Sequence, residues 1–320
     1  CKTAAVTLCG HHVIRNIKDR ENCHGKRERH GSFFLLSGWQ EKVGKHALRV
    51  ETGIREDRKG IKVKRVRLTV AYDGTNYRGW QVQPNGITIE QVLNEKLSAL
   101  LGEEIVVTGA SRTDSGVHSL GNIAIFDTNT RMPAEKISFA LNQRLPEDIV
   151  VQDSREVPSD WHPRYQNSRK TYEYRILNRT FRMPGRRFDT YFYYHPLNVE
   201  KMQQAAAYLE GEHDFKSFCA VGAQVKTTTR TIYSCNVTRD ASDVITVRVT
   251  GNGFLYNMVR IIAGTLIKVG GGELSPEEIP LILEKKDRSA AGPTAPAHGL
   301  TMIGIEYEGE NVGTDEAVCG

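Results

Sequence analysis

The sequence predicts an α+β protein made of two successive sets of strands and helices. Strand-like runs and helix-like runs with apolar residues three and four apart follow one another without a dominant repeat. A length of 320 residues is enough to bury a substantial core and to form two domains of ordinary size. We therefore expect two α+β halves side by side, each with a sheet that helices cover on one face, and a site in the cleft between them.

The first half, residues 61–165, is predicted to contain four strands and two helices. Its strands are expected at residues 63–72, 105–107, 123–126 and 149–157. Thr88 and Gln91 form a capping box at the start of the first helix, which Gly102 ends. The second helix is expected within residues 133–146, which begin and end with proline.

The second half, residues 166–310, is predicted to contain four strands and three helices. Its strands are expected at residues 170–176, 229–239, 244–251 and 300–307. Asn198 can cap a helix that Gly211 ends. Residues 254–269 predict a buried helix, since they are apolar nearly all round. Residues 275–278 start the last helix with a cap, a first-turn proline and two acids at its positive dipole end.

Two terminal segments are expected to lie outside these halves. Residues 1–60 contain 13 basic and 7 acidic residues, five of the ten histidines and few apolar runs, which predicts a poorly ordered basic extension of unknown role. Residues 311–320 are expected to form an acidic tail. The cysteines and histidines of the first segment fit no zinc spacing, so no metal site is predicted there: Cys9, His11, Cys23, His24 and His30.

The composition indicates a globular chain that stays in water. Hydrophobic residues make up 39% and charged residues 25% of the chain, and no stretch approaches the roughly 18 consecutive apolar residues of a membrane span. The six cysteines show no Cys-x-x-Cys spacing, and we find no secretory signal pattern. We therefore expect a cytoplasmic protein without structural disulfides.

Positive charge gathers in particular segments rather than over the whole chain. The net charge is +5, and the excess comes from residues 1–60. Residues 164–187 nevertheless carry eight basic residues and only one acid, Glu173. This asymmetry predicts a local anion-binding face, which is a better sign of nucleic-acid contact than overall charge.

The segment Gly109–His118 sets the carboxylate of Asp114 between a guanidinium and a tight turn, and it is expected to be a loop or hairpin. Asp-Ser-Gly is also a common turn composition, in which Asp bonds its own backbone and Gly takes a positive φ. Arg112 falls on the same side as Asp114 in extended geometry. It could orient the acid, contact phosphate or form only a weak surface pair. His118 is given no catalytic role.

Two further positions could carry chemistry. Arg260 is the only charged side chain of its apolar helix before Lys268, so it is either paired with an acid, for which Asp114 is the candidate, or extends its head to the surface. Tyr172 and Tyr174 share one face of their strand, where aromatics are usually core residues. Beside a basic segment, such an aromatic face can also hold an extruded base.

Several reaction classes lack their signatures in this sequence. It contains no phosphate-binding loop of the Gly-x-x-x-x-Gly-Lys type, no His-Glu-x-x-His, no Gly-x-Ser-x-Gly and no dinucleotide fingerprint that opens a helix. What remains is a single carboxylate that can act as nucleophile or base without a metal or an organic cofactor.

Five stretches occur in an order that is more specific than any single motif. They are residues 71–83 (AYDGTNYRGWQVQ), 111–118 (SRTDSGVH), 170–174 (KTYEY), 253–260 (GFLYNMVR) and 291–296 (AGPTAP). Through them, the chain from about residue 62 to residue 308 resembles the bacterial tRNA pseudouridine synthase A family, which acts on uridines 38 to 40 of the anticodon arm. Residues 1–60 have no counterpart there.

The resemblance implies roles for four residues. By it, Asp114 is the catalytic nucleophile, Arg112 helps to extrude the target nucleotide, Tyr172 stacks on the uracil and Arg260 pairs with Asp114. It implies an isomerase without cofactor or metal, and a homodimer whose subunits share the bound tRNA. The implied fold has two related halves, each a mixed or antiparallel sheet covered by helices in the ferredoxin/RRM-like manner, around a central catalytic cleft. The basic residues 164–187 leave open an alternative, a non-catalytic RNA-binding or RNA-folding module.

Overall fold

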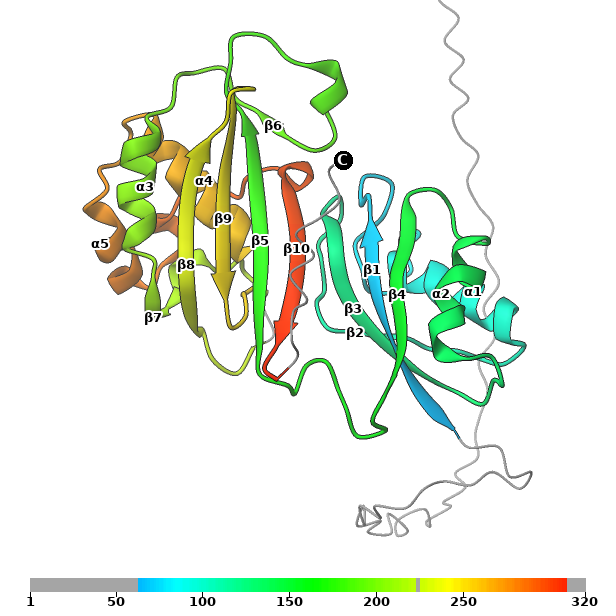
Figure 1. The fold of residues 1–320 in the computed structure, drawn as a ribbon. Helices are drawn as coiled ribbons and strands as arrows, with labels where there is room; N and C mark the ends of the chain where they lie inside the picture. Colours follow the sequence, from blue (N-terminus) through cyan, green and yellow to red (C-terminus); the bar gives the residue numbers. More distant parts are fainter. Residues whose placement is uncertain (1–62, 223–224, 310–320) are drawn as a thin grey trace, which may run out of the picture. The chain divides into compact units, whose positions relative to one another are not determined.

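The computed structural model describes residues 63–222 and 225–309, which form an α+β fold around one ten-stranded sheet (Figure 1). The strand order is β4-β1-β3-β10-β5-β9-β8-β7, with β2 paired to β3 and β6 paired to β5. The α+β class predicted from the sequence is confirmed. The predictions for residues 1–60, including their cysteines and histidines, and for residues 311–320 lie outside the described residues.

The first part of the described chain packs two helices on one face of its strands. Its elements are β1 (Lys64–Tyr72), α1 (Ile89–Leu101), β2 (Thr108–Gly109), β3 (His118–Thr128), α2 (Ala134–Asn142) and β4 (Ile149–Val157). β1 pairs antiparallel with both β3 and β4. Alternate residues of β1, such as Val66, Leu68 and Val70, are fully buried in one cluster with Leu93 of α1 and Ile137 of α2. This alternation is what a strand with one covered face requires.

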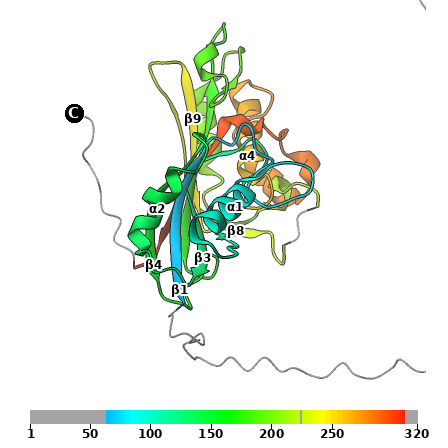
Figure 2. The ribbon, with the colours of Figure 1, turned by 90° about the vertical axis from the view of Figure 1, so that its right-hand side faces the viewer.

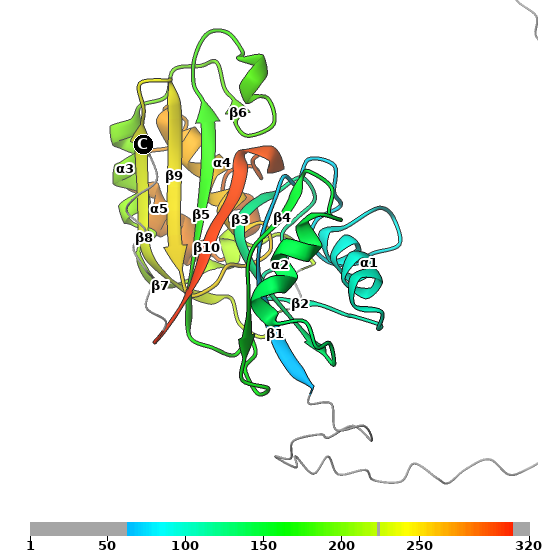
Figure 3. The ribbon, with the colours of Figure 1, turned by 45° about the vertical axis from the view of Figure 1, so that its right-hand side comes forward.

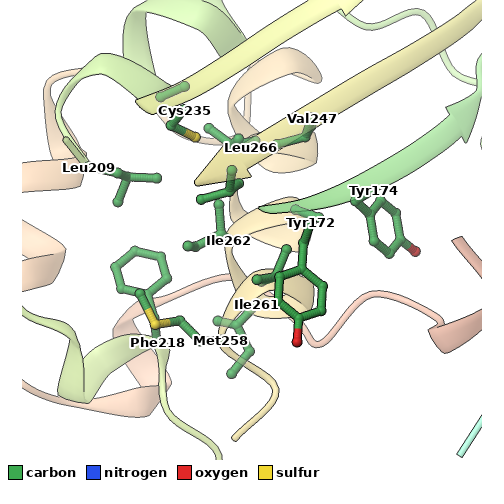
Figure 4. Packing of buried hydrophobic residues seen from close by; sticks show 14 of the residues in the cluster. Tyr172, Tyr174, Leu209, Phe218, Cys235, Val247, Met258, Ile261, Ile262 and Leu266 are labelled. Atoms are coloured by element: carbon green, nitrogen blue, oxygen red, sulfur yellow. The ribbon is translucent and has the colours of Figure 1, made fainter. Parts of the chain in front are cut away.

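The second part contributes the other half of the sheet and three helices. Its regular elements are β5 (Ser168–Leu177), β6 (Tyr191–Phe192), α3 (Val199–Ala207), β7 (Gly211–Asp214), β8 (Thr229–Arg239), β9 (Val244–Gly251), α4 (Met258–Gly270), α5 (Glu278–Lys285) and β10 (Leu300–Tyr307). Short 3-10 turns occur at Pro184–Arg186, Phe215–Phe218, Arg288–Ala290 and Ala297–Gly299. The core forms where α4 packs on the sheet: Ile261, Ile262 and Leu266 lie against Tyr172 and Val247 (Figure 4).

The strand β10 joins the two parts. It pairs parallel with β3 at Thr301 and Met302, and antiparallel with β5 along its other edge. The predicted halves therefore share one continuous sheet instead of carrying separate sheets, because pairing through β10 covers edges that would otherwise be open. As a result the loop before β3 and the strand β5 are only one strand apart (Figure 3). Helices α1 and α4 lie on the same side of the sheet (Figure 2).

The predicted strand at residues 105–107 is wrong. In this segment the strand consists of Thr108–Gly109 alone, which pair with β3. The residues before Thr108 run beside α1. Their backbone is satisfied by side chains of that helix, since Ile105 N–H donates to Ser98 Oγ (2.9 Å) and Val107 N–H donates to Asn94 Oδ1 (2.8 Å). The apolar side chains of Ile105 and Val107 are buried without strand pairing.

Three helix boundaries also differ from the prediction. Helix α4 begins at Met258 and not at residue 254, because Asn257 takes a left-handed φ of 60° that interrupts helical geometry. Helix α5 begins at Glu278, whose carboxylate reaches back to the N–H of Ser275 (2.7 Å), so the predicted cap and proline precede the helix. Helix α3 ends at Ala207, and Gly211 starts β7.

The structure also describes the length of the helices and the state of two cysteines. Of the helices in residues 63–222 and 225–309, none has the length and apolar character that crossing a membrane would take. Cys219 and Cys235, which the structure describes, are free and buried.

The stretch 291–296 crosses α4 at a distance that only glycine permits. A Cβ atom at Gly264 would lie 1.9 Å from the carbonyl oxygen of Pro293, and one at Gly292 would lie 2.6 Å from the backbone of Thr265. Arg288 donates to the Gly292 carbonyl (2.9 Å) and holds the stretch in place. This packing also positions Ala295, which belongs to the same stretch and whose carbonyl contacts Arg260 at the candidate site.

We predict that Gly264→Ala lowers the free energy of unfolding by about 2 kcal/mol, because the new methyl group must displace the Pro293 backbone. Gly304→Ala in β10 is the control, since a Cβ there meets nothing within 4 Å, and we expect a change within about 0.5 kcal/mol. Denaturant unfolding of both variants measures the difference. Equal free energies for the two variants would contradict the close packing of α4.

Candidate active site

The loop that carries Asp114 connects β2 to β3 and is held by residues of the preceding segment. A turn closes it, in which the Val117 N–H donates to the Asp114 carbonyl (3.1 Å) and Gly116 takes a φ of 78°. The hydroxyl of Tyr72 lies 2.8 Å from Thr113 Oγ1, and the Trp80 N–H donates to the Thr113 carbonyl (3.1 Å). The stretch 71–83 therefore serves as a support that fixes the backbone next to Asp114.

Arg260 lies in the first turn of α4 and forms an ion pair with Asp114. Its Nη1 lies 3.1 Å from Asp114 Oδ2, and the side chains of Arg260 and Asp114 are only 17% and 24% exposed. The same Nη1 donates to Asn257 Oδ1 (2.9 Å), and Nε donates to the Ala295 carbonyl (2.8 Å). The sequence left open whether Arg260 pairs with an acid or extends its head to the surface. In the structure it pairs with Asp114. The guanidinium is held at three points, so its direction is well defined.

The ion pair and burial act in opposite directions on Asp114. Burial raises the pKa of the carboxyl, the positive charge and hydrogen bond of Arg260 lower it, and the outcome is a pKa above the ordinary value. A carboxylate in this setting is less stabilised by water than an exposed one. Such a group is suited to act as a nucleophile or base, because it keeps more of its reactivity.

Tyr172 places an aromatic ring beside this acid. Its side chain belongs to β5, is 8% exposed and contacts Phe254 edge to face, with ring centroids 5.2 Å apart. Burial and the Asp114 charge raise the pKa of Tyr172 to about 12, so the hydroxyl is neutral at pH 7. Tyr174 shares the strand face but is fully buried, with its hydroxyl on the Pro296 carbonyl (2.8 Å) (Figure 4).

A cavity of about 790 Å³ brings the predicted site residues together. Asp114, Arg112 and Tyr172 line it, and Arg260 supports Asp114 from α4. The volume falls in the upper part of the range usual for small-molecule sites. Arg112 is exposed and makes no ion pair with Asp114, which within the described residues pairs with Arg260.

The predicted anion-binding face at residues 164–187 is divided in the structure. Lys170 and Arg164 line the cavity. Arg175 lies on the opposite face of β5, where Glu173 pairs with it (2.9 Å) and with Arg248 (2.6 Å). Strand alternation separates the two groups, since neighbouring residues of a strand face opposite sides.

The structure adds residues that the sequence interpretation missed. Asn257 and the Ala295 carbonyl orient Arg260, and a carbonyl leaves no signal in residue identity. His118, for which the sequence predicts no catalytic role, is held by polar contacts: its Nδ1 lies 3.0 Å from Asp73 Oδ1 and 3.2 Å from the Gly74 nitrogen, and its Nε2 lies 3.2 Å from the His298 carbonyl oxygen. In the described part of the chain, no group of three or more His, Cys, Asp or Glu side chains is arranged to hold a metal ion.

Comparison with known proteins places this chain in a family. A sequence profile described as tRNA pseudouridine synthase matches residues 68–166 and 205–308. The tRNA pseudouridine synthase A of Ruminiclostridium cellulolyticum is 49% identical over 245 residues, which are 77% of this chain and all of that protein. The proteins of the same name from Thermoanaerobacter sp. and Clostridium acetobutylicum are 48% and 47% identical with the same coverage. The chain belongs to the tRNA pseudouridine synthase family, whose members are isomerases.

We predict that Arg260→Met raises the pKa of Asp114 further, because it removes both a positive charge and a hydrogen bond that lower that pKa. A titration of carboxyl-labelled aspartate by ¹³C NMR measures this, with Asp114→Asn used to assign the signal. Arg260→Met should reduce the rate of pseudouridine formation strongly, because Asp114 loses its partner. It should change the free energy of unfolding little, because a Met side chain suits the apolar helix.

Arg248→Met serves as the control for that titration. Its guanidinium is half exposed and pairs with Glu173 on the other face of the sheet, so the pKa of Asp114 should not move. An unchanged pKa in Arg260→Met would show that the ion pair does not act on the acid.

Proposed function

We propose that this protein converts uridine to pseudouridine at positions 38 to 40 of the tRNA anticodon arm, with Asp114 as the catalytic nucleophile. The observation that carries the proposal is the ion pair between Asp114 and Arg260 beside a cavity lined by Tyr172. Relatives named tRNA pseudouridine synthase A, at 47–49% identity, support tRNA as the substrate.

The reaction needs one carboxylate, which acts as nucleophile or base, and no redox partner. The N1–C1′ bond of the uridine breaks, the uracil rotates in place, and C5 joins C1′. The proton on C5 is then released while N1 takes one up, so atoms and charges balance. The Asp114 carboxylate can attack the ribose or remove a ribose proton, and both routes require its ionised form.

The other site residues have supporting parts in this proposal. Arg260 keeps the Asp114 carboxylate ionised and aimed at the cavity. The ring of Tyr172 stacks on the uracil and keeps the detached base from leaving. Arg112, exposed at the cavity, helps to extrude the nucleotide. Binding then depends mainly on RNA shape and phosphate contacts, which makes the affinity sensitive to salt.

The setting of the enzyme is part of the same proposal. We expect a cytoplasmic homodimer whose subunits share the bound tRNA and which works without a cofactor or a metal. Sedimentation of the full chain, free and with tRNA, measures the dimer.

Asp114→Asn is expected to abolish pseudouridine formation while tRNA binding stays within a few fold, because the amide cannot act as nucleophile or base. Unmodified tRNA transcripts treated with either protein are mapped for pseudouridine at single-nucleotide resolution. The wild type should modify positions 38 to 40. Turnover by the variant would remove Asp114 from the mechanism. A wild type that binds without modifying would indicate a pure RNA-binding module, and release of free uracil would indicate a hydrolase.

Tyr172→Phe should keep activity within about twofold, whereas Tyr172→Ala should lose about fivefold to 150-fold, because stacking on an aromatic ring contributes about 1–3 kcal/mol per base. Single-turnover rates on a tRNA transcript distinguish the two variants. Equal losses in both would assign the role of Tyr172 to its hydroxyl and not to the ring.

A further inference from the structure

Four basic side chains line the cavity, those of Arg78, Arg112, Arg164 and Lys170, whereas Asp114, the one acid that lines it within the described residues, pairs with Arg260. Lys170, Arg164 and Arg112 form no ion pair with any described residue. Some arginines elsewhere in the described chain pair with acids, such as Arg65 with Asp127 and Arg248 with Glu173. The lining of the cavity therefore carries positive charge that its own acid does not balance.

Lys170 and Arg164 both donate to the stretch that leads to Asp114. The ammonium of Lys170 donates to the Ala110 carbonyl (3.3 Å) and to Ser111 Oγ (3.0 Å). Arg164 Nε donates to the Gly109 carbonyl (2.8 Å). These acceptors are neutral, so they direct the two cations without neutralising them. One ammonium proton and the two terminal nitrogens of the guanidinium remain for another ligand.

Holding this charge in place has a cost. Desolvation by burial, followed by the positive charges of Arg164 and Arg230, lowers the pKa of Lys170 to about 8. Desolvation and the charge of Arg112 also lower the pKa of Arg164, and the smaller opposite effect of Glu90 does not offset them. A neutral side chain could donate to the same carbonyls without repulsion between like charges. The use of two cations therefore suits the binding of an anion that is not part of the protein.

We propose that Lys170 and Arg164 bind a backbone phosphate of the RNA, next to the uridine that enters the cavity. This inference rests on the proposed function, because it takes the substrate to be RNA. Lys170 lies two residues before Tyr172 on the same face of β5, so the phosphate site and the stacking ring are one strand repeat apart. Through Gly109, Ala110 and Ser111, the phosphate would be linked to the loop that positions Asp114.

The test is a double-mutant cycle between protein and RNA. The full chain with Asp114→Asn, which prevents turnover, is titrated with an anticodon stem-loop RNA. In separate RNAs, one of the two phosphates that flank the target uridine is replaced by an uncharged methylphosphonate. At the contacted phosphate we expect affinity to fall about tenfold or more, as for loss of a charged hydrogen bond.

Adding Lys170→Met should make that replacement cost clearly less affinity, because the phosphate has already lost one of its two partners and only Arg164 remains. Lys170→Met should also lower the slope of log affinity against log salt by about one, and Lys170→Arg should restore most of the binding. Arg248→Met, on the other face of the sheet, should leave the effect of the methylphosphonate unchanged. A methylphosphonate three nucleotides away should weaken binding equally with and without Lys170.

The inference is overturned if the losses from Lys170→Met and from methylphosphonate multiply at both flanking positions, since the two groups then do not touch. This outcome is separate from failure of the proposed function, because the cycle measures binding alone. Coupling without any pseudouridine formation by the wild type would leave the phosphate site standing and the reaction wrong. Pseudouridine formation without coupling would support the reaction and contradict the phosphate site.

Discussion

The ion pair between Arg260 and Asp114 is the contact on which the proposed chemistry depends. It links the loop before β3 to the first turn of α4, two segments far apart in the sequence. A guanidinium in such an apolar helix carries a large desolvation cost unless an acid and further acceptors meet it. Asp114, Asn257 and the Ala295 carbonyl supply these acceptors. The pair therefore places a half-buried carboxylate where a substrate can reach it.

The continuous sheet provides the geometry for this contact. β10 lies between β3 and β5, so the loop with Asp114 and the strand with Tyr172 are kept one strand apart. The close crossing of residues 291–296 over α4 then brings the Ala295 carbonyl to Arg260. The sheet pairing and the packing on α4 thus orient the carboxylate of Asp114 and the guanidinium of Arg260.

Local sequence patterns predicted much of this fold. The bounds of β4, β8, β9 and β10 agree with the prediction, because alternating apolar residues are bounded there by turn residues. The pattern failed at Ile105–Val107, where the backbone partners are side chains of α1 instead of a strand. It also failed at the start of α4, because the left-handed φ of Asn257 leaves no periodic signal.

The sequence predicted the contacts of the site that follow from burying a charged side chain. It did not predict the contacts that depend on the position of a backbone carbonyl or on strand register. An arginine in an apolar helix calls for an acid, so the pairing of Arg260 with Asp114 could be named as one of two alternatives. The acceptors Ala110 and Ala295 act through their carbonyls, which any residue offers. The position of Lys170 at the cavity depends on the register of β5 against its neighbours, which no short motif encodes.

The most direct test of this account is a structure of the full chain carrying Asp114→Asn bound to an anticodon stem-loop RNA. The account predicts one uridine turned out of its stack into the cavity, with its ribose C1′ facing the side chain at position 114 and its uracil on the ring of Tyr172. A bound RNA whose bases all stay stacked outside the cavity, or a ribose that faces away from position 114, would contradict it.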